Sequence, residues 1–149
     1  ATNGTDIIFV TAVDPIQALD NPEVLNTAIE FDSEPATCQD VRNRNDKEKM
    51  NFIEGMCNAI LSTPLDDKVR IEKLRNYWLS VKKAQEDATY AAQSWKVSGF
   101  NFKVLSTLSN FTLKKGEVAN DCFHTSFKGH ARMAKELYKD LSQLNSSAN

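Results

Sequence analysis

The sequence predicts an α/β fold that is rich in helix and lacks part of its sheet. Two apolar, β-branched runs, at residues 6–13 and 100–111, are typical of strands. Helical patterns separate the two runs, as in a crossover connection between parallel strands. A two-stranded parallel sheet leaves two open edges. We therefore expect further strands from a second chain or from a segment removed from this one.

Composition fits a globular protein and gives no reason to expect nucleic acid as a partner. The 149 residues suit one domain, 1–149, with 41% hydrophobic and 26% charged residues and a formal net charge of -2. No apolar run in the sequence is long enough to span a bilayer, and we expect no signal peptide within it. Because the chain begins at Ala1 without a methionine, we expect a processed product.

The first half of the chain predicts one strand and two helices. The run "DIIFVTAV" is continuously apolar up to Asp14-Pro15, which is typical of a strand buried on both faces. Residues 15–44 read as loop with a short helix near 23–29. A second helix is predicted from the Asn45 cap, with Glu48 three residues later, to the stretch before Pro64.

A long helix follows, with Thr63 as its expected cap and Pro64 at its first position. Its apolar seam repeats at steps of three and four residues: Ile71, Leu74, Trp78, Val81, Gln85, Ala88, Ala92 and Trp95. We expect this seam to pack on a sheet or a neighbouring helix.

The last third predicts a strand, a turn and a final helix. "FNFKVLSTLSNF" follows the Ser98-Gly99 break, and Lys114-Lys115-Gly116 is expected to turn the chain. Ser126 is the predicted cap of the last helix. The buried face of that helix would consist of Met133, Leu137, Leu141 and Leu144.

Three glycosylation sequons, beginning at Asn3, Asn110 and Asn145, favour a secretory history. One sequon is a common accident, but three in a short chain beside cysteines are not. We expect a secreted or lumenal protein, either extracellular or lysosome-like, whose thiols would be oxidised.

Three cysteines leave one over after any internal pairing. We expect a bridge between Cys38 and Cys57, with Cys122 either bonded to another chain or buried free. The alternative is that all three are small core hydrophobes.

The stretch "NDCFHTSFKGHARMAKELYKDL", residues 120–141, places Asp121 three residues before His124. A carboxylate can accept a hydrogen bond from one imidazole nitrogen and fix its tautomer, while the other nitrogen removes a proton from a nucleophile. Asp-x-x-His alone is a weak signal. The alternative is that Asp121 caps a helix and His124 is an ordinary surface residue.

The same stretch resembles the terminal block of the SGNH (GDSL-type) lipases, and closely that of the phospholipase B branch. There Asp-Cys-Phe-His, a Ser and then Gly-His lead into the final helix. More loosely, "FNFKVLSTLSNF" looks like the last sheet strand of that family and "DIIFVTAVDPIQAL" like an inner strand. The resemblance implies that this chain is the C-terminal part of a flavodoxin-like, three-layer SGNH-hydrolase fold.

The resemblance also implies the roles of three residues. Asp121 would be the orienting carboxylate and His124 the general base of a Ser-His-Asp triad, whereas His130, the Gly-His histidine, would have a packing role. Such acyl-transfer chemistry requires no metal and no cofactor. The implied activity is that of a carboxylic ester hydrolase acting on phospholipids or other acyl lipids.

The family's other blocks are missing, since the sequence contains neither Gly-Asp-Ser nor Gly-x-Asn-Asp. We therefore expect this chain to be inactive alone and to need a second chain of the same precursor that carries the Gly-Asp-Ser nucleophile. One alternative is a secreted SGNH-like scaffold or interaction protein without catalysis. A weaker alternative is a helical lipid-binding module that uses the seam from Ile71 to Trp95.

Overall fold

The structure is a computed structural model that describes residues 4–31, 33–43, 60, 63–95 and 99–146. Its elements are β1 (Thr5–Val10), α1 (Gln17–Asp20), α2 (Pro22–Leu25), β2 (Ala28–Phe31), β3 (Glu34–Thr37), α3 (Cys38–Asn43), α5 (Lys68–Ser94), β4 (Phe100–Leu105), a 3-10 turn η1 (Thr107–Asn110) and α6 (Phe127–Ser146). The chain divides into two compact units. The first comprises residues 1–14, 77–111 and 133–149, and the second comprises residues 15–76 and 112–132.

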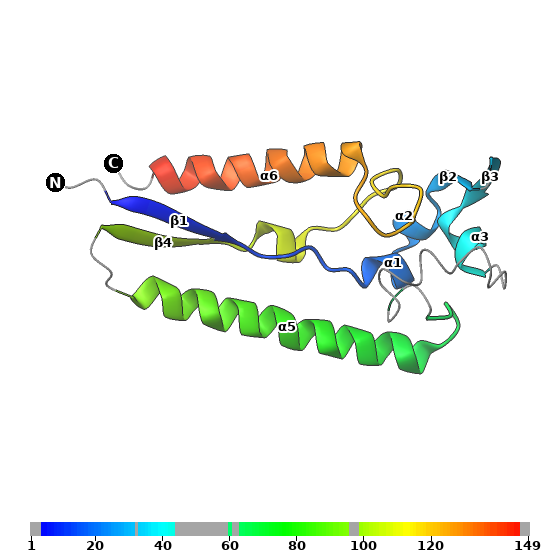
Figure 1. The fold of residues 1–149 in the computed structure, drawn as a ribbon, viewed down its shortest axis with the longest axis horizontal. Helices are drawn as coiled ribbons and strands as arrows, with labels where there is room; N and C mark the ends of the chain where they lie inside the picture. The colour runs from blue at the N-terminus through cyan, green and yellow to red at the C-terminus, as the bar shows by residue number, and fades with distance from the viewer. Residues whose placement is uncertain (1–3, 32, 44–59, 61–62, 96–98, 147–149) are drawn as a thin grey trace. The chain divides into compact units, whose positions relative to one another are not determined.

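The first unit contains the predicted parallel pair of strands. β1 and β4 run side by side (Figure 1) and pair in parallel, in a register from Thr5 opposite Phe100 to Val10 opposite Leu105. The second strand is shorter than predicted, because the chain enters η1 at Thr107. The crossover inferred from the two distant apolar runs is confirmed.

One face of this sheet carries an aromatic cluster formed by a residue from each strand and by Trp95. Phe9 stacks on Phe102 with ring centroids 6.2 Å apart, and Trp95, just beyond α5, meets Phe102 edge-on at 5.8 Å. Beside β1, a cavity of about 350 Å³ lies between the strand and α5. It is lined by Phe9, Val10, Thr11, Gln85, Ala88, Thr89, Ala92 and Trp95.

The prediction that β1 is buried on both faces is wrong for this chain. Ile8 is 38% exposed and Val10 is 48% exposed, whereas Leu105, the partner of Val10 on β4, is buried. Among the described residues, β1 pairs only with β4. Ile8 and Val10 therefore lack the cover that their hydrophobicity would favour.

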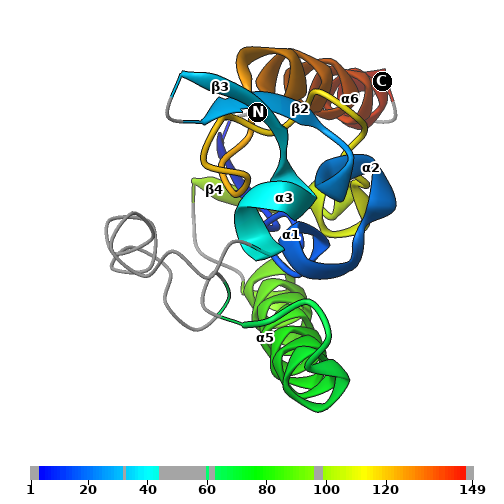
Figure 2. The same ribbon diagram turned by 90° about the vertical axis from the view of Figure 1, so that its right-hand side faces the viewer.

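The second unit contains an antiparallel hairpin that the sequence did not reveal. β2 and β3 pair from Ala28 opposite Thr37 to Phe31 opposite Glu34, and both strands contact α3 (Figure 2). The helix predicted at 23–29 ends at Leu25 as α2, and its cap is Asn21, whose Oδ1 accepts from the Glu23 N–H at 3.0 Å. Ala28 and Ile29 belong instead to β2 of the hairpin.

The two long helices agree with the predictions in type but differ in detail. α5 begins at Lys68 rather than at Pro64, and Asp67 in place of Thr63 accepts from the Arg70 N–H at 2.9 Å. Along its predicted seam, Ile71 and Ala92 are buried but Ala88 and Trp95 are exposed. The helix predicted after Asn45 falls outside the described residues, except for Ile60.

α6 begins where predicted. Ser126 Oγ accepts from the Gly129 N–H at 3.3 Å, which confirms Ser126 as the cap. Met133, Leu137 and Leu141 are half-buried, and the side chain of Leu144 lies outside the described part. The prediction of a mixed α/β chain is thus confirmed at that general level. In the portion of the chain that the structure covers, none of the helices combines the length and apolar character that a bilayer span requires.

Candidate active site

A short irregular hairpin in the second unit carries the Asp121–His124 motif. Val118 and Thr125 form an antiparallel bridge, and the Ala119 N–H donates to the His124 carbonyl at 2.8 Å. The Ser126 N–H donates to the Glu117 carbonyl at 2.9 Å, so both ends of the hairpin are closed by backbone hydrogen bonds. Residues 120–123 form its tip.

Asp121 uses both carboxylate oxygens to organise this tip. Oδ1 accepts from the backbone N–H groups of Phe123 and His124, each at 3.0 Å, and Oδ2 lies 2.5 Å from His124 Nδ1. The three-residue spacing makes this possible, because an Asx turn brings the N–H of the following residues back to the carboxylate. The structure therefore brings the two predicted site residues together.

The electrostatics of Asp121 favour its charged form. Partial burial opposes ionisation, but the His124 side chain and the two backbone N–H groups outweigh it and hold the pKa of Asp121 below its ordinary value. An ionised Asp121 keeps a proton on His124 Nδ1. His124 Nε2 is then left as the acceptor, which is the arrangement that a general base requires.

The imidazole of His124 is presented to its surroundings. Its side chain is 55% exposed, that of Asp121 is 36% exposed, and the Phe123 ring meets the imidazole edge-on. Among the described residues, His124 Nε2 has no hydrogen-bond partner. The dyad can therefore accept a proton from a group that approaches from outside these residues.

His130 does not have the packing role predicted from the resemblance. Its ring is exposed, and Nε2 lies 2.8 Å from Thr125 Oγ1. The buried member of the Gly-His pair is Gly129, against which the Glu117 carbonyl oxygen packs.

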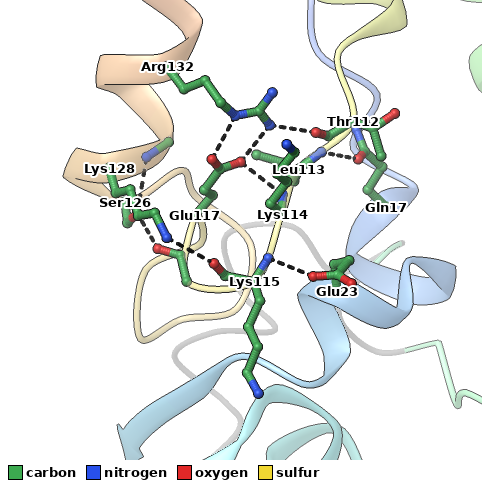
Figure 3. A network of polar contacts seen from close by, with 12 residues as sticks. Gln17, Glu23, Thr112, Leu113, Lys114, Lys115, Glu117, Ser126, Lys128 and Arg132 are labelled. Carbon is green, nitrogen blue, oxygen red and sulfur yellow. Dashed lines mark hydrogen bonds and ion pairs between the residues drawn. The ribbon is translucent and has the colours of Figure 1, made fainter.

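The start of the hairpin is fixed to α6 by a buried ion pair (Figure 3). Arg132 donates from Nε to Glu117 Oε1 and from Nη2 to Oε2, both at 2.6 Å, and Nη2 also donates to the Thr112 carbonyl at 2.5 Å. The Glu117 side chain is only 2% exposed. The hydrogen bonds from Arg132 outweigh desolvation and hold the pKa of Glu117 below its ordinary value.

The segment that leads into the hairpin is bound to the N-terminal part of the second unit. Gln17 Oε1 accepts from the Leu113 N–H at 2.7 Å, and Glu23 Oε2 accepts from the Lys115 N–H at 3.2 Å (Figure 3). At Gly116, with φ +78°, the N–H donates to Thr27 Oγ1 at 3.0 Å. This confirms the predicted turn and shows which side chains hold it.

The predicted Cys38–Cys57 bridge is replaced in the structure by a Cys38–Cys122 disulfide. The two Cα atoms are 5.4 Å apart, and both cysteines are buried. Cys122 is therefore bonded within the chain, neither free nor linked to another chain, and Cys57 lies outside the described residues. The predicted pairing was wrong because the spacing of three cysteines in a sequence does not decide which two of them pair. A disulfide is compatible with an oxidising, secreted or lumenal setting.

Of the three sequon asparagines, only Asn110 has a described side chain. It is exposed in η1, and its Oδ1 accepts from Lys82 Nζ at 3.0 Å. Asn3 and the side chain of Asn145 lie outside the described residues. Within the described ranges, no cluster of three or more His, Cys, Asp or Glu side chains has the arrangement of a metal site.

Sequence reasoning missed Glu117 and Arg132, although they support the site. Both are charged residues in a charged stretch, which ordinarily indicates a solvated surface. The signal that was available is the glycine at position 129, which permits the close approach of the Glu117 backbone. Comparison of the chain with protein-family models, with curated proteins and with solved structures gave no match.

Proposed function

We propose that this chain is the C-terminal chain of a secreted SGNH-type lipase or esterase, similar to phospholipase B, that acts only together with a partner chain. The observation that carries the proposal is the 2.5 Å contact between Asp121 Oδ2 and Nδ1 of the exposed His124 side chain. A carboxylate that orients a histidine in this way is two thirds of a Ser-His-Asp triad.

In the proposed reaction, the partner chain supplies the serine and the oxyanion donors. His124 Nε2 takes the serine hydroxyl proton as Oγ bonds to the carbonyl carbon of the ester. The same proton passes to the alcohol oxygen as the C–O bond of the ester breaks. Water then repeats the cycle on the acyl-enzyme, which releases the carboxylic acid and restores the serine. Asp121 stabilises the imidazolium at each stage.

The exposed edge of β1 supports the need for a partner chain. Ile8 and Val10, which alternate with Phe9 along β1, are 38% and 48% exposed, and Val10 also lines the cavity beside Phe9. β4, in contrast, carries Asn101 and Lys103, which both donate to Asp6 on β1, at 3.1 Å and 2.7 Å. Because edge strands commonly carry lysine whereas inner strands are apolar, we propose that the partner's nearest strand pairs with β1.

The test uses the complete precursor, processed and purified as the assembled complex. His124→Ala should lower the rate of ester hydrolysis on the order of 10³-fold or more. His130→Ala is the matched control, since His130 lies six residues away, is also exposed, and has a side chain that bonds only to Thr125 among the described residues. The control should retain activity within a few-fold. Unchanged hydrolysis by the His124 variant would exclude the proposed role.

A serine-directed fluorophosphonate separates this proposal from the non-catalytic scaffold. The probe should label the partner chain of the wild-type complex, and labelling should fall sharply in the His124→Ala complex because the serine loses its base. Absence of any labelled chain in the wild-type complex would favour the scaffold.

A further inference from the structure

The residue between Asp121 and Phe123 is in an unusual backbone conformation. Cys122 has φ +59°, a left-handed value that side-chain-bearing residues rarely adopt. Its N–H donates to the Ala119 carbonyl at 2.9 Å, which closes a tight turn. Immediately afterwards, the N–H groups of Phe123 and His124 return to the Asp121 carboxylate. The dyad geometry thus depends on the chain reversal at Cys122.

The bond that anchors this turn comes from another part of the second unit. Cys38 is fully buried at the start of α3, directly after β3, and its N–H donates to the Thr27 carbonyl at 3.1 Å. Its disulfide to Cys122 therefore connects the hairpin tip to a fixed point 84 residues earlier in the chain.

We propose that the Cys38–Cys122 disulfide is a positioning element for His124, because it holds Cys122 in the left-handed conformation that the Asp121–His124 contact requires. That the disulfide holds the Asp121–His124 contact in place is an inference about this chain alone. That this contact matters for catalysis rests on the proposed function.

The first test measures the imidazole tautomer of His124 by ¹H–¹⁵N NMR at a pH where the ring is neutral. In the oxidised chain, Nδ1 should carry the proton, as its contact with Asp121 demands. A phosphine reductant, which becomes a phosphine oxide as the disulfide becomes two thiols, should shift His124 to a mixture of both tautomers. His130 serves as the internal reference. An unchanged His124 signal in a chain shown by mass to be reduced, and by its amide spectrum to be folded, would overturn the proposal.

Two double variants test the role of backbone conformation and remain informative if the reduced chain unfolds. Both carry Cys38→Ala, combined with Cys122→Ala or with Cys122→Gly. Glycine adopts positive φ without steric cost, so the glycine pair should keep more of the Nδ1–H signal than the alanine pair. The proposal would be overturned if the alanine pair kept the full Nδ1–H signal of His124. It would also be overturned if both variants were folded and lost this signal to the same extent.

In the assembled complex, the alanine pair should lower kcat on the order of 10-fold to 100-fold with little change in KM, because the base is misplaced rather than removed. If the wild-type complex hydrolyses no ester while the NMR results hold, the proposed function fails and the positioning inference stands.

Discussion

A β-carbon built on Gly129 would lie 2.4 Å from the carbonyl oxygen of Glu117. Gly129 is in the first turn of α6, and the same oxygen accepts from the Ser126 N–H at 2.9 Å. The absence of a side chain therefore lets α6 approach the start of the Asp121–His124 hairpin.

Gly129→Ala should lower the free energy of unfolding by about 1–3 kcal/mol, as expected when a well-packed contact is overfilled. The usual advantage of alanine over glycine in a helix would predict the opposite sign. Urea unfolding decides between them. The control is Lys128→Ala at the neighbouring exposed position, which should change stability by less than about 0.5 kcal/mol. An alanine variant as stable as the wild type would show that the hairpin can shift at no cost.

Arg132→Met should lower the free energy of unfolding by about 3 kcal/mol at neutral pH, because it leaves the buried Glu117 carboxylate without its cation. Arg75→Met is the control, since it removes an exposed pair with Asp20 and should cost less than about 1 kcal/mol. Equal losses in the two variants would contradict the special role of the buried pair.

The cost of Arg132→Met should also depend on pH. The pKa of Glu117 is lowered in the folded chain, so its pairing stabilises fully above the unfolded value of about 4.3 and is lost as pH falls through the folded value. The difference between wild type and variant should therefore shrink on acidification below about pH 4. Unfolding curves collected from pH 7 downward measure this, and a constant difference would contradict it.

Asp121 should titrate below its ordinary range in the isolated chain, and His124→Ala should raise its pKa. The substitution removes the side-chain hydrogen bond to Oδ2 but leaves the two backbone N–H donors on Oδ1. Carboxyl ¹³C NMR measures the titration directly. His130→Ala should leave the Asp121 curve in place, and an identical curve in the His124 variant would argue against the Asp121–His124 hydrogen bond in solution.

Val10→Lys should weaken association with the partner chain while leaving the isolated chain folded, because Val10 is already exposed on β1. The dissociation constant should rise at least tenfold if the β1 edge is buried in the complex, since one lysine charge would need to be desolvated. Tyr90→Lys, an exposed position on α5, is the comparison. Sedimentation of the two mixtures would reveal the difference, and identical association would place the partner elsewhere.

The sequence carried information on those features that local patterns control. Apolar runs located β1 and β4, Ser126 marked the start of α6, and the spacing of Asp121 and His124 sufficed for their contact. Each depends on residues within one turn or one strand, where periodicity and capping are direct consequences of backbone geometry.

Features that depend on distant partners could not be predicted. Cys38 finds Cys122 rather than Cys57 because of the tertiary fold. The hairpin of β2 and β3 includes Pro35, a residue that ordinarily argues against a strand, and is joined through Ser33 at φ +63°. The burial of Glu117 depends on its contact with Arg132, and in the sequence either residue alone resembles surface charge.

The Cys38–Cys122 bond also makes residues 38–122 a covalently closed ring. A protease that cuts anywhere inside this ring leaves two fragments that remain joined and that separate on a gel only after reduction. The hairpin with Asp121 and His124 would then stay tethered to the N-terminal fragment through Cys38, so a cut between Cys38 and Cys122 would not by itself release the proposed catalytic pair.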